Sequence, residues 1–462
     1  MSDGQASQVT DGGGQWPAWP MWVLGFAVMI DNIDQFIVRG TSNQIEKAFG
    51  VGDFSIAVLF SAFILVNGIV TMPASYVADR WNRTRVMGVT IAVWSVLSAL
   101  GGFVPVSAFA LLVVLRGALG FGQAVSDPSG ASLIADYYPL EKRGRAFSIQ
   151  QCLFYVGVGL GLAIGSAIGT HFGHYGWRIA FVVSIVPGLL IAAACRRLPE
   201  PRRGTSDRAH VTGDQTIEMA EEAPEPLFPA GIRQFIRDML SGLRADVRTI
   251  LAIPTMRYSL VGVSSILFTV SAVSTWMPTL YERQFHLHQS SANLAFGALI
   301  VCAGIPGTVV GGALADRWVN RFAGARMVIP GVCIGVSGVL FLISFIPLPF
   351  WASYVLQLSA MLAATASVPA LRAGLTDAIP ANLRGTGFGA FNMASVIFGS
   401  AAAPLVMSGL ADQFGGNYRV AFAIAMPIVI IGAGFLFLAR RHVEQDTAKI
   451  FAAVVTAMAE QA

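Results

Sequence analysis

A five-residue segment, Trp177-Arg178-Ile179-Ala180-Phe181, recurs 241 residues later as Tyr418-Arg419-Val420-Ala421-Phe422. Two further sets of residues recur at nearly the same spacing: Asp79-Arg80-Trp81 as Asp316-Arg317-Trp318, and Asp136, Pro139, Arg143, Gly144 and Phe147 as Asp377, Pro380, Arg384, Gly385 and Phe388. Three matches at nearly one offset predict that the chain is built from two homologous halves.

The composition indicates that both halves lie in a membrane. The chain has 462 residues, of which 55% are hydrophobic and only 12% charged, whereas an ordinary soluble domain has roughly 25% charged residues. The apolar residues form long uncharged blocks, such as Val86–Leu112 and Ser259–Leu280. Each block contains about the 20 residues that a helix needs to cross roughly 30 Å of hydrocarbon. The basic residues lie between the blocks, where they indicate topology rather than contacts with nucleic acid.

Twelve predicted spans account for the apolar blocks. Six fall in each half: 19–40, 53–77, 84–104, 106–136, 145–171 and 177–196, then 257–281, 290–315, 325–346, 349–377, 386–411 and 418–439. The predicted fold is an all-α membrane protein with twelve transmembrane helices in two pseudo-symmetric six-helix bundles. In secondary transporters with internal repeats, the substrate path lies between the repeats.

Polar segments complete the predicted organisation. It consists of a cytoplasmic N-terminal tail (1–18), a first bundle (19–197), a cytoplasmic linker (198–256), a second bundle (257–440) and a cytoplasmic C-terminal tail (441–462). Within the linker, residues 231–251 carry an apolar stripe at helical spacing with arginines on the other face. This pattern predicts an amphipathic helix on the cytoplasmic leaflet, either an anchor between the bundles or a sensor of lipids or a partner.

Basic residues are distributed unequally between the two sides of the bundles. Of the 30 lysines and arginines, only five lie on the side opposite the linker, namely Arg39, Lys47, Arg178, Arg283 and Arg419. The positive-inside rule then places both termini in the cytoplasm, and the expected location is the inner (plasma) membrane of a bacterium. Residues 1–16 contain no lysine or arginine, so they lack the basic region of a signal peptide, and we expect the first span to be retained.

Away from the ends of the predicted spans, five charged residues remain: Asp31 and Asp34 in the first, Arg116 and Asp127 in the fourth, and Arg372 in the tenth. A charge at the centre of a transmembrane helix costs at least about 2.5–3.5 kcal/mol, so it is retained for a reason. At about 1.5 Å per residue, Asp34 and Arg116 lie at similar heights and can pair. The pair either links protonation to anion binding or is a static tie between helices. We assign Asp31, Asp34, Arg116 and Asp127 to proton coupling or gating.

Uncharged polar residues are further candidates for the substrate path. Gln123 shares a helix face with Arg116, and Gln151 and Asn392 occupy matching positions in the two halves. Such residues either line a cavity or join helices by hydrogen bonds. The predicted substrate-binding residues are Arg116, Gln123, Gln151, Arg372, Asn392 and Trp276.

The loop from Ser75 to Arg85 resembles the signature loop of the major facilitator superfamily, and residues Gly312 to Arg326 form a second copy. Arg116, Gly120 and Gly122 resemble another element of the superfamily. The resemblance implies a cytoplasmic latch that ties spans together in one state and releases them in another. The alternative is that these charges only cap helices and set topology. The implied latch residues are Asp79, Arg80, Arg83, Asp136, Arg143, Asp316, Arg317, Asp377 and Arg384.

Further segments resemble the Spinster branch of this superfamily. They are Asp31 to Gly40, Ile45 to Phe49 with Gly52-Asp53, Asp79 to Arg83, Leu133 to Asp136 and Trp276 to Thr279. The resemblance implies export of lysophospholipids or of sphingosine phosphate. Two positions depart from it: Gln35 stands where an arginine usually follows the aspartate, and Gln123 stands where the family has a glutamate.

The sequence therefore predicts a proton-linked secondary transporter for an amphipathic, lysophospholipid-like anion, working by alternating access as a monomer. Its expected partners are the substrate, protons and membrane lipids, without nucleic acid, cofactor or metal. The alternative on the same fold is a proton-coupled organic-anion symporter or a drug exporter. A membrane-embedded enzyme is disfavoured because the sequence has no nucleophile elbow and no HExxH. His171 and His174 have no further evident metal ligand.

Overall fold

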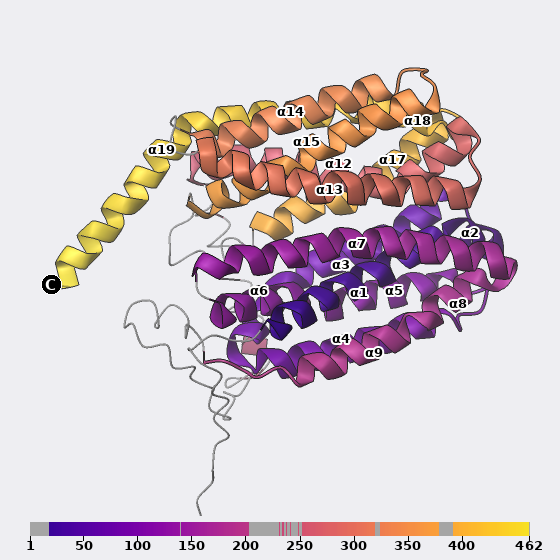
Figure 1. The fold of residues 1–462 in the computed structure, drawn as a ribbon, viewed down its shortest axis with the longest axis horizontal. Helices are drawn as coiled ribbons and strands as arrows, with labels where there is room; N and C mark the ends of the chain where they lie inside the picture. The colour runs from indigo at the N-terminus through magenta and orange to yellow at the C-terminus, as the bar shows by residue number, and fades with distance from the viewer. Residues whose placement is uncertain are drawn as a thin grey trace, which may run out of the picture.

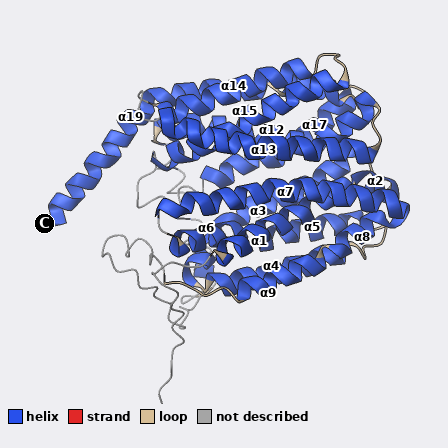
Figure 2. Cartoon of the chain, viewed as in Figure 1, coloured by secondary structure: helices blue, strands red, loops and turns tan. Residues whose placement is uncertain are grey.

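The computed structural model describes residues 18–138, 140–202, 252–318, 324–377 and 391–461, with isolated residues between 231 and 248. Every element in these ranges is a helix (Figure 2). Two bundles lie side by side, one from each half of the chain (Figure 1). Most of the predicted linker, including the amphipathic helix over 231–251, lies outside the described residues.

The first bundle contains six membrane passes. Its helices are α1 (Trp19–Gly40), α2 (Ser42–Phe49), α3 (Asp53–Arg80), α4 (Arg83–Gly101), α5 (Phe109–Gln123), α6 (Ser126–Tyr137), α7 (Leu140–Phe172), η1 (Gly173–Tyr175), α8 (Gly176–Val183) and α9 (Ile185–Arg196). The fourth predicted span is broken between α5 and α6, and the sixth at Ser184 between α8 and α9. Short α2 connects the first two passes at one end of the bundle.

The second bundle repeats this order. Its helices are α12 (Pro254–Phe285), α13 (Gln289–Trp318), α14 (Ala325–Ser344), α15 (Phe350–Asp377), the π-helical turn η3 (Val396–Ala401), α17 (Ala402–Gln413), α18 (Tyr418–Ala425) and α19 (Pro427–Gln461). Helix α19 continues past residue 440, where the sequence predicted a separate tail, and projects away from the bundle (Figure 1).

Twelve membrane passes are confirmed. Eleven helical stretches among the described residues are long and apolar enough to cross a membrane. One of them, Lys142–Arg196, has 55 residues and contains η1. A stretch of that length with a turn inside corresponds to two passes, since one pass needs about 20 residues.

The two bundles share one packing pattern. In the first, α3 packs on α5 and α4 on α9; in the second, the equivalent helices pack likewise, α13 on α15 and α14 on α19. Between the bundles, α7 lies against α13, and α3 against η3 and α17. These two contacts are related by the repeat, so the pseudo-symmetry predicted from the recurring segments extends to the bundle interface.

Glycines allow the closest helix packing in the first bundle. Gly157 and Gly161, four residues apart on α7, face α1. A β-carbon at these positions would lie 2.5 and 2.9 Å from the carbonyl oxygens of Met29 and Ile33. Such small-residue spacing lets helices approach where no hydrophobic force acts between them. Helix α1, which carries the charged residues, is therefore held tightly against α7.

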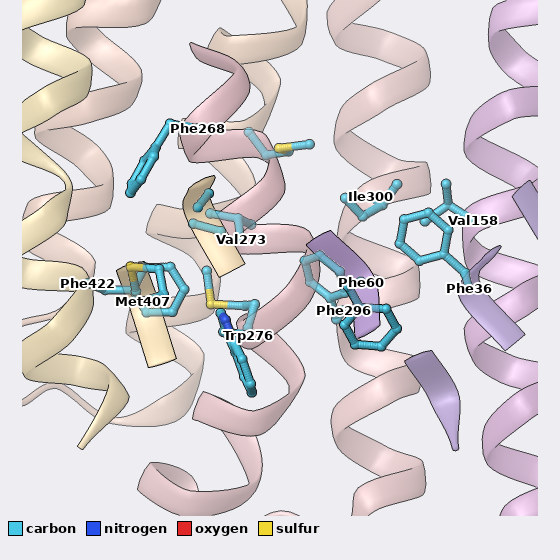
Figure 3. Packing of buried hydrophobic residues seen from close by; sticks show 14 of the residues in the cluster. Phe36, Phe60, Val158, Phe268, Val273, Trp276, Phe296, Ile300, Met407 and Phe422 are labelled. Atoms are coloured by element: carbon cyan, nitrogen blue, oxygen red, sulfur yellow. The ribbon is translucent and has the colours of Figure 1, made fainter. Parts of the chain in front are cut away.

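Apolar side chains fill the contact between the bundles. Phe36 and Val158 of the first bundle and Phe296 and Ile300 of the second belong to one buried cluster, and Figure 3 shows them together with Phe60. We call the end of the bundles that carries α2 the α2 end, and the opposite end, where residue 202 leaves the first bundle, the linker end.

Candidate functional site

A buried ion pair joins α1 to α5. Arg116 Nη1 lies 3.5 Å from Asp34 Oδ2, and the side chains of Arg116 and Asp34 are 2% and 1% exposed. The other carboxylate oxygen, Asp34 Oδ1, accepts a hydrogen bond from Ser98 Oγ on α4 at 2.5 Å. Three helices of the first bundle thus meet at Asp34, and the two charges that the sequence placed at one height are in contact.

The guanidinium of Arg116 keeps unused hydrogen-bonding capacity. Its Nε and Nη1 are buried and have no hydrogen-bond partner, and Asp34 Oδ2 likewise has none. Phe63 and Phe181 lie near the guanidinium, with ring centroids 5.6 and 5.9 Å away. A buried donor without a partner is costly. Arg116 is therefore suited to bind an additional acceptor, such as an anionic ligand or water.

Arg39 is a second, half-buried cation that sequence reasoning missed. Counted among the basic residues that set topology because it stands at the end of the first span, Arg39 lies in the last turn of α1, over the rings of Phe36 and Phe60 at 4.5 and 5.1 Å. Its Nη1 is buried without a hydrogen-bond partner, and it is close enough to Arg116 for mutual repulsion. The sequence contained a signal for this position, since Arg39 follows Gln35 by four residues and therefore lies on the same face of the helix.

Asp31 supplies a second carboxylate near this cluster. It is half-buried on α1, and its charge attracts Arg116. This part of the first bundle thus contains two arginines, Arg39 and Arg116, and two aspartates, Asp31 and Asp34, both of which act on Arg116. The cluster is neutral when both carboxyl groups are ionised. The side chain of Asp127, the fourth predicted coupling residue, lies outside the described residues.

The two departures from the Spinster pattern contact each other. Gln35 Nε2 donates to Gln123 Oε1 at 3.2 Å, between α1 and α5. A pair of neutral amides thus stands where the resemblance implies an arginine and a glutamate. Replacing both partners of a pair together leaves no unpaired buried charge. The loss of the glutamate is therefore structurally compensated at Gln35.

Two predicted substrate-binding residues meet at a tyrosine between the bundles. The hydroxyl of Tyr155 on α7 lies near Gln151 on the same helix and within electrostatic range of Arg372 on α15. It also lies 3.3 Å from Thr308 Oγ1 on α13. Tyr155, which the sequence did not single out, therefore connects the two bundles and brings Gln151 near Arg372.

Two other predicted substrate-binding residues, Trp276 and Asn392, lie away from the cluster around Arg116. Trp276 is 2% exposed, donates its Nε1 hydrogen to Pro404 O at 3.1 Å and stacks on Tyr418. Its ring packs in the core of the second bundle. A side chain buried to this extent is not available for contact with a ligand in this conformation. Asn392 is half-buried and does not join the cluster around Arg116.

Three of the predicted latch residues, Arg83, Asp136 and Arg143, have described contacts at the linker end. Arg83 is fully buried and forms ion pairs with Asp136 and Glu200 at 2.5 and 2.7 Å. It also donates to Pro201 O at 2.9 Å, and Arg143 donates to Tyr138 O at 2.9 Å. Arg83 therefore ties α4 and α6 to the first residues of the linker. Glu200 lies in the predicted linker, outside the spans, so sequence reasoning did not identify it.

The other latch residues are less informative. Arg317 is exposed near the end of α13. The side chains of Asp79, Arg80, Asp316 and Asp377, and all of Arg384, lie outside the described residues. Their role stays a prediction.

Two pseudo-symmetric bundles of six membrane passes, with buried opposite charges in the first, define the class of secondary transporters. The sequence model of the Major Facilitator Superfamily matches residues 24–402. The chain belongs to this superfamily and is a Spinster-like transporter, not an enzyme.

Curated relatives and solved structures that resemble this chain include members of the Spinster branch. "Protein spinster homolog 1" of Xenopus laevis is 23% identical over 92% of this chain and 81% of its own length. "Sphingosine-1-phosphate transporter SPNS2" of Mus musculus is 26% identical over 64% of this chain, and the match spans only 51% of the mouse protein. A bacterial homologue of the human lysosomal transporter Spinster, in an inward-facing unoccupied conformation, has a TM-score of 0.71 at 20% identity, covering 93% of this chain and 98% of that one.

Proposed function

We propose that the chain transports an amphipathic anion of the lysophospholipid class and that transport is linked to protons. The observation that carries this proposal is a set of buried guanidinium nitrogens without hydrogen-bond partners, Arg39 Nη1 and Arg116 Nε and Nη1. Arginine donors in a fixed fork suit phosphate oxygens. The aromatic rings around both guanidiniums suit the apolar part of the same molecule.

The link to protons follows from the balance of charges. The four charges are those of Arg39, Arg116, Asp31 and Asp34, so the cluster has no net charge when both carboxyl groups are ionised. Protonation of one carboxyl group leaves an arginine without a counter-charge. An anion then binds more tightly, and by linkage the bound anion favours proton uptake. Asp34 is the stronger candidate because its carboxylate is buried in direct contact with Arg116.

The comparisons support the substrate class without deciding it. One relative is called a sphingosine-1-phosphate transporter, and sphingosine phosphate joins a phosphate to a long apolar chain. A solved neighbour is a proton:xylose symporter at 15% identity and TM-score 0.67, so the fold alone is compatible with quite different substrates. We place the protein in the inner membrane with both termini in the cytoplasm, because the loops at the linker end carry most of the basic residues.

The test is ligand-induced thermal stabilisation of the purified protein. We expect lysophosphatidylglycerol to raise the Tm of the wild type, more at pH 5.5 than at pH 7.5, and to have little effect on Arg116→Gln. Arg178→Gln is the matched control, since Arg178 bonds to backbone carbonyls of Gly102 and Val104 away from the cluster. Stabilisation by small carboxylates and not by lysolipids would support the organic-anion alternative instead.

A further inference from the structure

Side chains close the α2 end by hydrogen bonds that run from one bundle to the other. Asn43 on α2 donates to Glu282 Oε2 on α12 at 2.6 Å. Gln44 and Gln289 hydrogen bond at 3.1 Å, and Gln289 also donates to Gly40 O at 3.2 Å. None of these contacts lies within a single bundle, so they hold the bundles together only in a conformation that is closed at this end.

Asp53 at the start of α3 makes the strongest of these contacts. Both of its carboxylate oxygens accept hydrogen bonds from Arg283 at the end of α12, each at 2.7 Å. Tyr418 at the start of α18 donates to Asp53 Oδ2 at 2.9 Å. One carboxylate of the first bundle thus binds two elements of the second. A bidentate arginine pair is also the strongest geometry for such a bond.

A second carboxyl group, Glu46 on α2, lies close enough to Asp53, Glu282 and Arg283 for their charges to act on it. Three carboxyl groups, Glu46, Asp53 and Glu282, thus gather around Arg283, whose guanidinium is already bonded to Asp53. Two further charged or titratable groups, Lys47 on α2 and His288 before α13, act on Glu282.

We propose that the Glu46–Asp53 pair is a pH-sensitive switch for this inter-bundle contact, separate from the Asp34–Arg116 pair. With Glu46 protonated, Asp53 keeps its bonds to Arg283 and Tyr418, and Glu46 adds no charge. With Glu46 ionised, three carboxylates surround one arginine, and their repulsion favours separation of the two bundles at the α2 end.

The direction of the pH effect follows from the pKa of Glu46. Burial, followed by the negative charge of Asp53, raises the pKa of Glu46 to about 7 in the closed state. In an open α2 end the exposed Glu46 would titrate near its ordinary pKa of about 4.3. Closure is therefore accompanied by proton uptake between these two values. Lowering the pH through this window favours closure by at most about tenfold per pH unit, and the effect is lost above pH 7.

Spin-label distances between the bundles test the switch directly. Tyr175, 65% exposed after α7, and Phe414, 46% exposed after α17, are replaced by cysteine in a background without Cys152, Cys195, Cys302 and Cys333. Double electron–electron resonance then measures the distance between the two spin labels at pH 5.5 and 8.5. We expect the short distance to dominate at pH 5.5 and to lose population at pH 8.5.

Three substitutions decide whether Glu46 is responsible. Glu46→Gln and Glu46→Ala, two ways of removing the titrating group, are expected to abolish the pH response. Lys47→Gln, at an exposed neighbour on α2, is expected to retain it. The proposal is overturned if the wild type shows the same distances at both pH values, or if both Glu46 variants respond as the wild type does. No substrate is present, so the result is independent of the proposed substrate.

Discussion

Gln35 on α1 donates a hydrogen bond to Gln123 on α5 at 3.2 Å, and Gln35 directly follows Asp34 of the buried ion pair. The amide pair therefore joins the same two helices as the charged pair. Because both amides are neutral, proton linkage at this level of the first bundle depends on Asp34 and Asp31. The Spinster resemblance implies an arginine at position 35 and a glutamate at position 123, and this chain has a neutral glutamine at each.

A double-mutant cycle tests the contact between Gln35 and Gln123. We expect Gln35→Arg and Gln123→Glu each to lower Tm, because each introduces a buried charge without a partner. The double variant should recover part of the loss, with a coupling free energy of about 0.5–3 kcal/mol. The measurement is the Tm of the wild type, both single variants and the double variant. Strictly additive effects would contradict direct contact between the two side chains.

Close packing of α1 on α7 depends on the absence of a side chain at Gly161. We expect Gly161→Ala to destabilise the protein by about 1–3 kcal/mol, because the new methyl group would press on the backbone of Ile33 and overpacking must displace a helix. Gly434→Ala is the matched control, since a β-carbon there meets no atom within 4 Å. Equal Tm values for the two variants would show that α1 and α7 are not in this contact.

Arg83 neutralises two carboxylates at the linker end. Removing its charge in Arg83→Met leaves Asp136 buried and Glu200 without its ion-pair partner. Loss of one partner of a buried pair costs about 3–5 kcal/mol, so we expect a clear fall in Tm. The same substitution at exposed Arg85 should change Tm little. Protease digestion near residue 200 offers a second readout, and unchanged digestion in Arg83→Met would argue against the tie to the linker.

Arg39 is predicted to bind the anionic group together with Arg116. In Arg39→Gln we expect the affinity for lysophosphatidylglycerol to fall at least about tenfold, since a hydrogen bond to a charged group contributes roughly 1.5–3 kcal/mol. Arg39→Lys keeps the charge and should lose less. Ligand binding is measured by intrinsic tryptophan fluorescence or by thermal shift. An Arg39→Gln variant with wild-type affinity would remove Arg39 from the site.

The fold was predictable because membrane insertion leaves few choices. Uncharged blocks near 20 residues long must form helices, and the recurring segments Trp177–Phe181 and Tyr418–Phe422 set the two halves. The breaks at Ser184 and after Gln123 were not predicted, because both sides of each break are apolar and hydropathy does not register a change of helix direction.

The site was predictable in part. Helix rise alone placed Asp34 opposite Arg116, which are 3.5 Å apart. Arg39 was counted among the basic residues that set topology because it stands at the end of an apolar block, where arginines usually have that role. Trp276 was expected on the substrate path from its family resemblance, but its indole nitrogen is bound by Pro404 O. Contacts made across the bundle interface, such as Arg283 with Asp53, depend on tertiary packing and leave no local pattern.

Proton uptake on ligand binding tests the central claim most directly. Lysophosphatidylglycerol, whose phosphodiester does not titrate near neutral pH, is added to purified protein in weakly buffered detergent solution with a pH indicator. We predict that the wild type takes up protons on binding, at most about one per ligand, and that Asp34→Asn binds with little uptake. Binding to the wild type without proton uptake, or equal uptake by Asp34→Asn, would contradict linkage between anion binding and protonation at Asp34.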